Sequence, residues 1–251
     1  MMQHSDTKIL GVLGGLGPMA TAYYLELMIK MTDAATDQEH LQSIVMNFPT
    51  VPDRTAYILG RSEESPLEPM IALGRQLKDM GAGVLATPCI TAHYFHQSLQ
   101  DGIGLPMIHG IECVARQLAA AGISRVGLMA TDGTVQSGIF QQQVEAQGME
   151  LVLPDEQGQR DVMTLIYDQI KAGKQADPVL FEQVKQQLRR QGAQVVVLGC
   201  TELSLLKKGA YLGTGILDAL EVLAQESLIA CGKPIKKEYQ CLFTPFSHKE
   251  F

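Results

Sequence analysis

Hydrophobic and polar positions along the chain fall into blocks that predict strands followed by helices. Short runs of small and branched apolar residues, such as residues 8–15 and 43–48, are typical of buried parallel strands. Segments with helical periodicity follow them; residues 159–172 are expected to form one helix, and another is expected to begin near Thr91. This alternation predicts an α/β protein with mostly parallel sheets flanked by helices.

The pattern also repeats within the chain. Residues 81–95 and 192–206 each have a Gly-Ala start, an apolar strand, and a cysteine followed closely by threonine. The strands around Gly11 and Gly127 are separated by a similar distance along the chain. The repetition predicts two pseudo-symmetric lobes with a ligand site in the cleft between them.

We assign residues 1–110, together with about 214–251, to the first lobe and residues 111–213 to the second. The strand-helix unit at residues 215–232 is expected to cross back to the first lobe. Residues 236–251 have no clear period, so we expect them to form a loosely attached tail.

Composition narrows the class of protein. Hydrophobic residues make up 46% of the 251 residues, and no apolar run approaches the roughly 20 residues needed to span a bilayer. The N-terminus lacks a charged start and an apolar secretory core, so we expect a cytoplasmic protein and no membrane partner. The net charge is −7 and no basic stripe occurs, which argues against a nucleic-acid partner.

The cysteines carry the first candidate chemistry. Five are present without a Cys-x-x-Cys pair, so neither a disulfide framework nor a zinc ribbon has support. Cys89 and Cys200 follow predicted central strands, where ligand sites of α/β sheets form, and nearby helix starts would lower their thiol pKa. One thiol on either side of a cleft could remove a proton from one face of a carbon and return one to the other. The alternative is that both are buried structural residues.

Two further motifs have weaker chemical interpretations. Residues Gly15–Ala20 fit the G-x-G-x-x-A dinucleotide fingerprint, but the acidic residue expected at the end of the next strand is absent. We therefore disfavour a nicotinamide cofactor; the loop is either a plain turn or one whose N–H groups face a carboxylate. Cys89, His93 and His96 could ligate a metal from one helix face, but no fourth ligand is evident, so we expect no metal.

Several polar residues have two interpretations each. Arg54 could clamp a carboxylate, or it could pair with a neighbouring acidic residue in a solvated loop. Lys171 lies where the dipole of a helix C-terminus favours lysine. Thr131 and Thr134 suit both a carboxylate site and a helix N-cap.

The motifs in combination resemble the aspartate/glutamate racemase family, most closely its aspartate racemases, over about residues 9–230. The segments that carry the resemblance are GVLGGLGPMAT, PDRTAYILG, PCITAHYF, ATDGTVQSGIF and LGCTEL. The resemblance implies two pseudo-symmetric α/β lobes with the active site between them. It also implies a cofactor-independent enzyme, a small acidic amino acid as its ligand, and a homodimer.

The resemblance assigns roles to individual residues. It implies that Cys89 and Cys200 are the paired acid and base, that Arg54 and its neighbours bind a substrate carboxylate, and that Lys171 meets the acidic side chain. The substrate-binding positions that it implies are Asp53, Arg54, Thr55, Ile90, Thr91, Ala92, Thr131, Thr134, Lys171 and Thr201. We therefore predict racemisation of an acidic amino acid, with aspartate as the first choice.

One position departs from the family pattern. The family motif reads Pro-Cys-Asn-Thr-Ala-His, whereas Ile90 stands here in place of the asparagine. An unpaired polar group on the substrate commonly costs about 1–3 kcal/mol. The departure leaves open glutamate, another amino acid or a related small acid as the substrate. An alternative from another class is a catalytically silent protein that binds a dicarboxylate.

Overall fold

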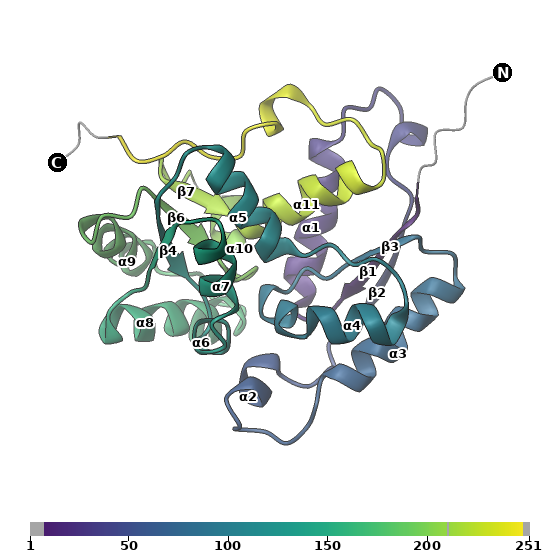
Figure 1. The fold of residues 1–251 in the computed structure, drawn as a ribbon, viewed down its shortest axis with the longest axis horizontal. Coiled ribbons are helices and arrows are strands. Elements are labelled where there is room, and N and C mark those ends of the chain that lie inside the picture. Colours follow the sequence, from purple (N-terminus) through teal and green to yellow (C-terminus); the bar gives the residue numbers. More distant parts are fainter. Residues whose placement is uncertain (1–7, 210, 248–251) are drawn as a thin grey trace.

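The computed structural model describes residues 8–209 and 211–247, and it has the predicted α/β architecture (Figure 1). Two parallel sheets are present, one of three strands in the order β2-β1-β3 and one of four strands in the order β5-β4-β6-β7. Helices flank both sheets. In the described part of the chain, no helix has the length and apolar character needed to cross a membrane.

The first sheet is formed by the N-terminal third of the chain. Its strands are β1 (Leu10–Gly14), β2 (Ser43–Asn47) and β3 (Val84–Ala86). The helices of this part are α1 (Pro18–Met31), η1 (Asp37–Glu39), α2 (Arg54–Ile58), α3 (Leu67–Asp79), η2 (Ile90–Phe95) and α4 (His96–Ile103). Every residue of β1 is buried, as its continuous apolar run predicted for a central parallel strand.

The second sheet repeats this arrangement with one more strand. Its strands are β4 (Arg125–Met129), β5 (Glu150–Val152), β6 (Val195–Leu198) and β7 (Ile216–Asp218). The remaining helices are α5 (Gly110–Ala120), α6 (Asp132–Gln136), α7 (Ile139–Ala146), α8 (Glu156–Met163), η3 (Thr164–Ile170), α9 (Pro178–Arg190), α10 (Ser204–Gly209), α11 (Ala219–Ala230) and η4 (Lys237–Tyr239). Because β4 and β6 are parallel and pair up to Met129 and Leu198, their carboxyl ends meet at one edge of the sheet.

The strand-helix unit near the C-terminus connects the two halves. Strand β7 pairs with β6 in the second sheet, whereas α11 packs against α1 of the first half and α5 of the second. The face of α11 toward the first sheet carries Leu220, Leu223 and Leu228, which share a core with residues of β1. The assignment of whole lobes to residue ranges stays a prediction.

One local prediction differs in detail and another is wrong. The helical segment expected at about residues 159–172 is present, but it begins earlier, as α8, and continues as the π-helical turn η3. The segment expected as a loose tail is attached, because the Gly215 N–H donates to the Thr244 carbonyl (2.7 Å) and the Phe246 N–H donates to the Gln194 carbonyl (2.9 Å). Residues 248–251 lie outside the described residues.

Candidate active site

The two cysteines of the repeated motif line one small cavity. Cys89 follows β3 and caps the N-terminus of η2, and Cys200 follows β6 after one glycine. Their exposed fractions are 6% and 4%. The cavity has a volume of about 10 Å³, which is enough for about one water molecule. The site is therefore closed around the two thiols in this conformation.

Most of the residues predicted to bind a ligand lie around this cavity. The wall is formed by Leu16, Asp53, Arg54, Thr55, Cys89, Ile90, Thr91, Thr131, Tyr167, Lys171, Cys200, Thr201 and Glu202. Two predicted residues are not part of the wall. Thr134 reaches it through its hydroxyl contact with Thr91, and Ala92 is buried in the core of the first half.

Arg54 is part of the cavity wall, and carbonyl groups hold its guanidinium in place. It starts α2, whose N-cap Asp53 accepts a hydrogen bond from the Ala56 N–H (2.7 Å). Its Nη1 donates to the carbonyls of Val51 and Pro52, and its Nη2 donates to the carbonyl of Leu16 (2.9 Å). The buried Nε has no hydrogen-bond partner. This N–H is a charged donor that suits a carboxylate or thiolate acceptor.

The guanidinium also lies beside Cys89. Burial disfavours its charge, but the neighbouring Cys89 and Asp53 more than compensate and raise the pKa of Arg54. Its three carbonyl contacts hold it in place, so the positive charge is fixed before any ligand arrives. This arrangement excludes the solvated loop charge that was the alternative interpretation of Arg54, because the side chain is buried.

Cys200 lies beside a carboxylate. Its thiol donates a hydrogen bond to Glu202 Oε2 (3.0 Å). Burial and the Glu202 carboxylate raise the pKa of the Cys200 thiol well above its ordinary value, and Lys171 opposes them. The prediction that a nearby helix start lowers this pKa is therefore wrong, because burial and an adjacent carboxylate outweigh the helix dipole.

Lys171 enters the cavity from the end of the π-helical turn. Its Nζ lies 3.9 Å from Asp53 Oδ2 and 4.3 Å from the centre of the Tyr167 ring. Burial lowers the pKa of Lys171, but the Glu202 carboxylate, with Tyr167 and the two cysteines as smaller contributors, outweighs burial and raises it. The lysine is thus held as a cation beside the thiols. The predicted position of Lys171 at a helix C-terminus is confirmed, and the side chain also lines the cavity.

Three threonine hydroxyls join the two halves of the molecule at the site. Thr91 Oγ1 lies 3.0 Å from both Thr131 Oγ1 and Thr134 Oγ1, and the latter two lie 3.1 Å apart. Thr131 also caps α6 by accepting a hydrogen bond from the Thr134 N–H (3.3 Å). The N-cap interpretation is confirmed, and the same hydroxyls form part of the cavity region.

The glycine-rich loop after β1 separates the thiol cavity from a larger one. Gly15 has a φ of 91°, and its N–H donates to Thr21 Oγ1 (2.9 Å), so this N–H does not face a ligand. A Cβ at Gly17 would lie 2.5 Å from Glu202 Oε1, so a larger residue there would require the end of the Glu202 side chain to move. The outer cavity, of about 560 Å³, shares Leu16, Arg54, Lys171 and other wall residues with the thiol cavity.

Three wall residues were not predicted from the sequence: Leu16, Tyr167 and Glu202. Glu202 directly follows Cys200-Thr201, and Tyr167 precedes Lys171 by one helical turn, so spacing alone carried a signal for both. The Tyr167 hydroxyl donates weakly to Asp53 Oδ2 (3.5 Å).

The histidines considered as metal ligands make hydrogen bonds to carbonyl groups. His93 Nδ1 lies 3.1 Å from the Cys89 carbonyl oxygen, and His96 Nε2 lies 2.8 Å from that of Met107. No cluster of three or more histidine, cysteine, aspartate or glutamate side chains with a geometry suited to a metal is found within the described residues.

Comparison with known proteins identifies the family of the chain. Residues 13–227 match the family model described as Asp/Glu/Hydantoin racemase. Over 225 residues, the chain is 22% identical to the Broad specificity amino-acid racemase RacX of Bacillus subtilis (strain 168), covering 88% of this chain and 96% of that protein.

Solved structures share the fold over nearly the whole chain. The Picrophilus torridus aspartate racemase is similar with a TM-score of 0.79 and 27% identity, covering 94% of this chain and 99% of that one. A glutamate racemase from Francisella tularensis subsp. tularensis SCHU S4, in complex with D-glutamate, is similar with a TM-score of 0.63 and 14% identity, covering 90% of this chain and 81% of that one.

Proposed function

Because the chain belongs to the Asp/Glu/hydantoin racemase family, and is thereby an amino-acid racemase, we propose that it interconverts the enantiomers of aspartate without a cofactor. The observation that carries the proposal is that the Cys89 and Cys200 thiols line one closed cavity together with Arg54 and Lys171. Two cations beside two thiols suit a small substrate with two carboxylates. The similarity to an aspartate racemase favours aspartate over glutamate as the substrate.

The reaction moves one proton at each thiol. The Cys89 thiolate takes the α-proton of the substrate, and the Cys200 thiol gives its proton to the opposite face of the same carbon. Afterwards Cys89 is the thiol and Cys200 the thiolate, which is the arrangement needed for the opposite enantiomer. The contacts support this starting state, because Cys89 lies beside the Arg54 cation and Cys200 donates its proton toward Glu202.

The cations stabilise the charge that develops during proton removal. As the α-proton leaves, negative charge spreads onto the α-carboxylate, and fixed donors lower the energy of that state. The vacant Nε edge of Arg54 suits one substrate carboxylate. Lys171 suits the other, which would replace the long contact of the lysine with Asp53 (3.9 Å). Entry requires the wall shared with the outer cavity to open, because about 10 Å³ does not hold an amino acid.

The test follows α-proton exchange and optical rotation together. L-aspartate is incubated in deuterium oxide with wild-type protein, Cys89→Ala, Cys200→Ala, and the matched control Cys113→Ala, which alters a buried cysteine outside the cavity wall. We expect both site variants to lose racemisation and the control to keep it. Full racemisation by either site variant would refute the two-thiol mechanism.

The same assay separates the alternatives. A panel of aspartate, glutamate and other amino acids identifies the substrate, which Ile90 leaves open. A catalytically silent dicarboxylate-binding protein would gain thermal stability with aspartate but show no exchange of the α-proton. A homodimer and a cytoplasmic location remain predictions from the resemblance and the sequence.

A further inference from the structure

The carbonyl group of Cys89 accepts two hydrogen bonds from within its own turn. One comes from the Ala92 N–H (3.1 Å), the i to i+3 bond of a 3₁₀ helix. The other comes from the imidazole Nδ1 of His93 (3.1 Å). In an α-helix, the backbone N–H of His93 would fill that second place. The imidazole thus takes the place of the α-helical bond and favours the tighter 3₁₀ geometry.

The protonation state of His93 is determined by its surroundings. The side chain has no solvent exposure, and burial together with His109 lowers the pKa of His93 to about 3. The ring is therefore neutral near pH 7. Because a carbonyl only accepts, the single proton is on Nδ1, and the buried Nε2 is left without a partner. An unpaired buried acceptor is unfavourable, so the packing of the core alone does not explain a histidine here.

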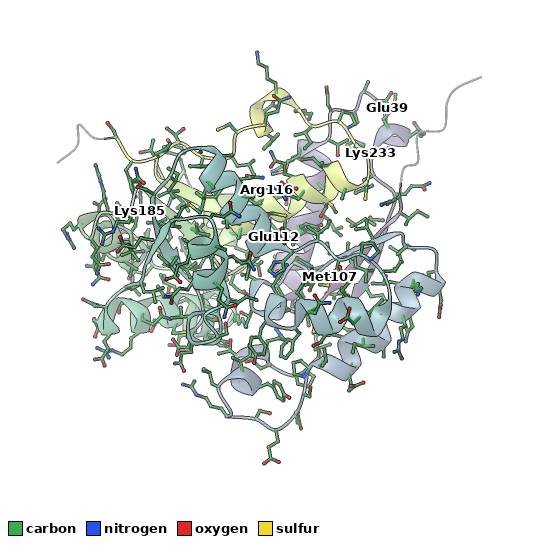
Figure 2. The ribbon with its side chains drawn as sticks, viewed as in Figure 1. Glu39, Met107, Glu112, Arg116, Lys185 and Lys233 are labelled. Carbon is green, nitrogen blue, oxygen red and sulfur yellow. The ribbon has the colours of Figure 1, made fainter. Side chains whose placement is uncertain are left out.

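The surroundings of this ring connect the Cys89 turn to the segment between the two halves. The His93 ring lies against the rings of His96 and His109, with centroids 6.4 Å and 5.6 Å away. His96 Nε2 donates to the Met107 carbonyl, and Gln100 Oε1 accepts from the Met107 N–H (3.1 Å). Figure 2 shows Met107 in the segment between α4 and α5. In this segment His109 lies against the His93 ring, whereas the bonds to Met107 come from His96 and Gln100 and do not involve His93 or Cys89.

We propose that His93 is a positioning residue that acts through Cys89. Its Nδ1–H fixes the carbonyl of Cys89 and keeps η2 in the 3₁₀ form, which sets the direction of the Cys89 thiol and of Thr91. Successive side chains turn by a larger angle in a 3₁₀ helix than in an α-helix. Relaxation toward an α-helix would therefore rotate Thr91 away from Thr131 and Thr134 and shift the thiol.

The proposal rests on the proposed function only for its kinetic consequence. A displacement of a reacting group by about 1 Å reduces a rate by about 100-fold. We expect His93→Leu to lower kcat for aspartate by about this factor with little change in KM. His93→Asn places an amide N–H where Nδ1–H was and should retain most of the rate. His93→Gln places its amide where Nε2 was and should resemble His93→Leu.

The matched control is His96→Leu, which removes an imidazole–carbonyl bond of the same cluster that does not touch Cys89. Its kcat should stay near that of the wild type. If His93→Asn and His93→Gln lose the same fraction of kcat, or if His93→Leu keeps the wild-type value, the proposal is refuted. The asparagine–glutamine pair decides the question even if His93→Leu does not fold.

A second measurement does not depend on racemisation. The rate of Cys89 alkylation by iodoacetamide, measured by peptide mass spectrometry, is compared with that of exposed Cys241 in the same chain. His93→Leu and His93→Gln should change this ratio, whereas His93→Asn and His96→Leu should not. An unchanged ratio in all variants overturns the positioning role. Absence of α-proton exchange in the wild type, with a changed ratio, would instead refute the racemase proposal alone.

Discussion

Acid should lower the free energy of unfolding of this protein through His93, because burial lowers the pKa of its imidazole in the folded state. In the unfolded chain a histidine takes up a proton near pH 6.5. In the folded chain, burial and His109 lower the pKa of His93 to about 3. Between these values the unfolded state binds more protons, so the free energy of unfolding decreases as the pH falls. Each pKa unit corresponds to about 1.4 kcal/mol, so the whole window is worth on the order of 5 kcal/mol.

The assay is urea unfolding of the wild type and His93→Asn between about pH 7.5 and pH 4.5. Above pH 6.5 the difference in unfolding free energy between them should be constant. By about pH 4.5 it should have shifted by about 3 kcal/mol in favour of His93→Asn. Burial and Asp218 raise the pKa of Glu221 to about 7, so its protonation opposes the trend, but this occurs in both proteins and cancels in the difference. A difference that does not vary with pH would refute the reasoning.

Three further predictions follow from the cavity wall. Glu202→Gln removes the carboxylate that raises the pKa of the Cys200 thiol. Alkylation of Cys200 at pH about 8–9 should therefore become faster, and racemisation should become slower by roughly tenfold or more. Unchanged alkylation would contradict the effect of Glu202 on the Cys200 thiol. Lys171→Met removes a charge-assisted contact with the substrate carboxylate, worth about 1.5–3 kcal/mol, so kcat/KM for aspartate should fall roughly 10- to 100-fold. An unchanged kcat/KM would exclude a contact between Lys171 and the substrate. Ile90 belongs to the core that includes Ile111 and Phe140, so Ile90→Asn buries an amide there. In urea unfolding, the free energy of unfolding should fall by about 3 kcal/mol for Ile90→Asn and by about 1 kcal/mol for Ile90→Val. Equal losses would show that the amide finds hydrogen-bond partners.

The fold could be predicted because its signals are local. A parallel strand buried on both faces requires a continuous apolar run, and the runs ending before Cys89 and Cys200 are of this kind. Position at the carboxyl end of a strand then follows from topology, so the two thiols could be expected at sheet edges. Whether the two thiols share one cavity depends on how the two sheets pack against each other. In the sequence, only the internal repeat suggested this packing.

The remaining features depend on contacts between distant residues. The π-helical turn that directs Tyr167 and Lys171 into the cavity has the same apolar periodicity as an α-helix over a few residues, so the pattern could not distinguish them. The tail is attached both by backbone hydrogen bonds of Thr244 and Phe246 and by the side chains of Leu242, Phe243 and Phe246, which pack against the cores. These apolar residues follow no helical or strand period, so the sequence pattern did not show what they contact. The pKa of Cys200 depends on burial and on the rotamer of Glu202, which are properties of the folded chain.

The repeat makes the two cysteines look equivalent, but the residues after them already differ. The first motif reads Cys89-Ile90-Thr91 and the second Cys200-Thr201-Glu202, so the threonine is shifted by one position. In the first half, this shift places an apolar side chain in the core shared with α5 and directs the Thr91 hydroxyl across to Thr131. In the second half it places a carboxylate within reach of the sulfur. The two halves therefore place different groups beside their thiols: the Arg54 guanidinium lies beside Cys89, and the Glu202 carboxylate accepts a hydrogen bond from Cys200. A two-thiol proton transfer needs one sulfur with its proton and one without, and the two sulfurs exchange these states when the opposite enantiomer reacts.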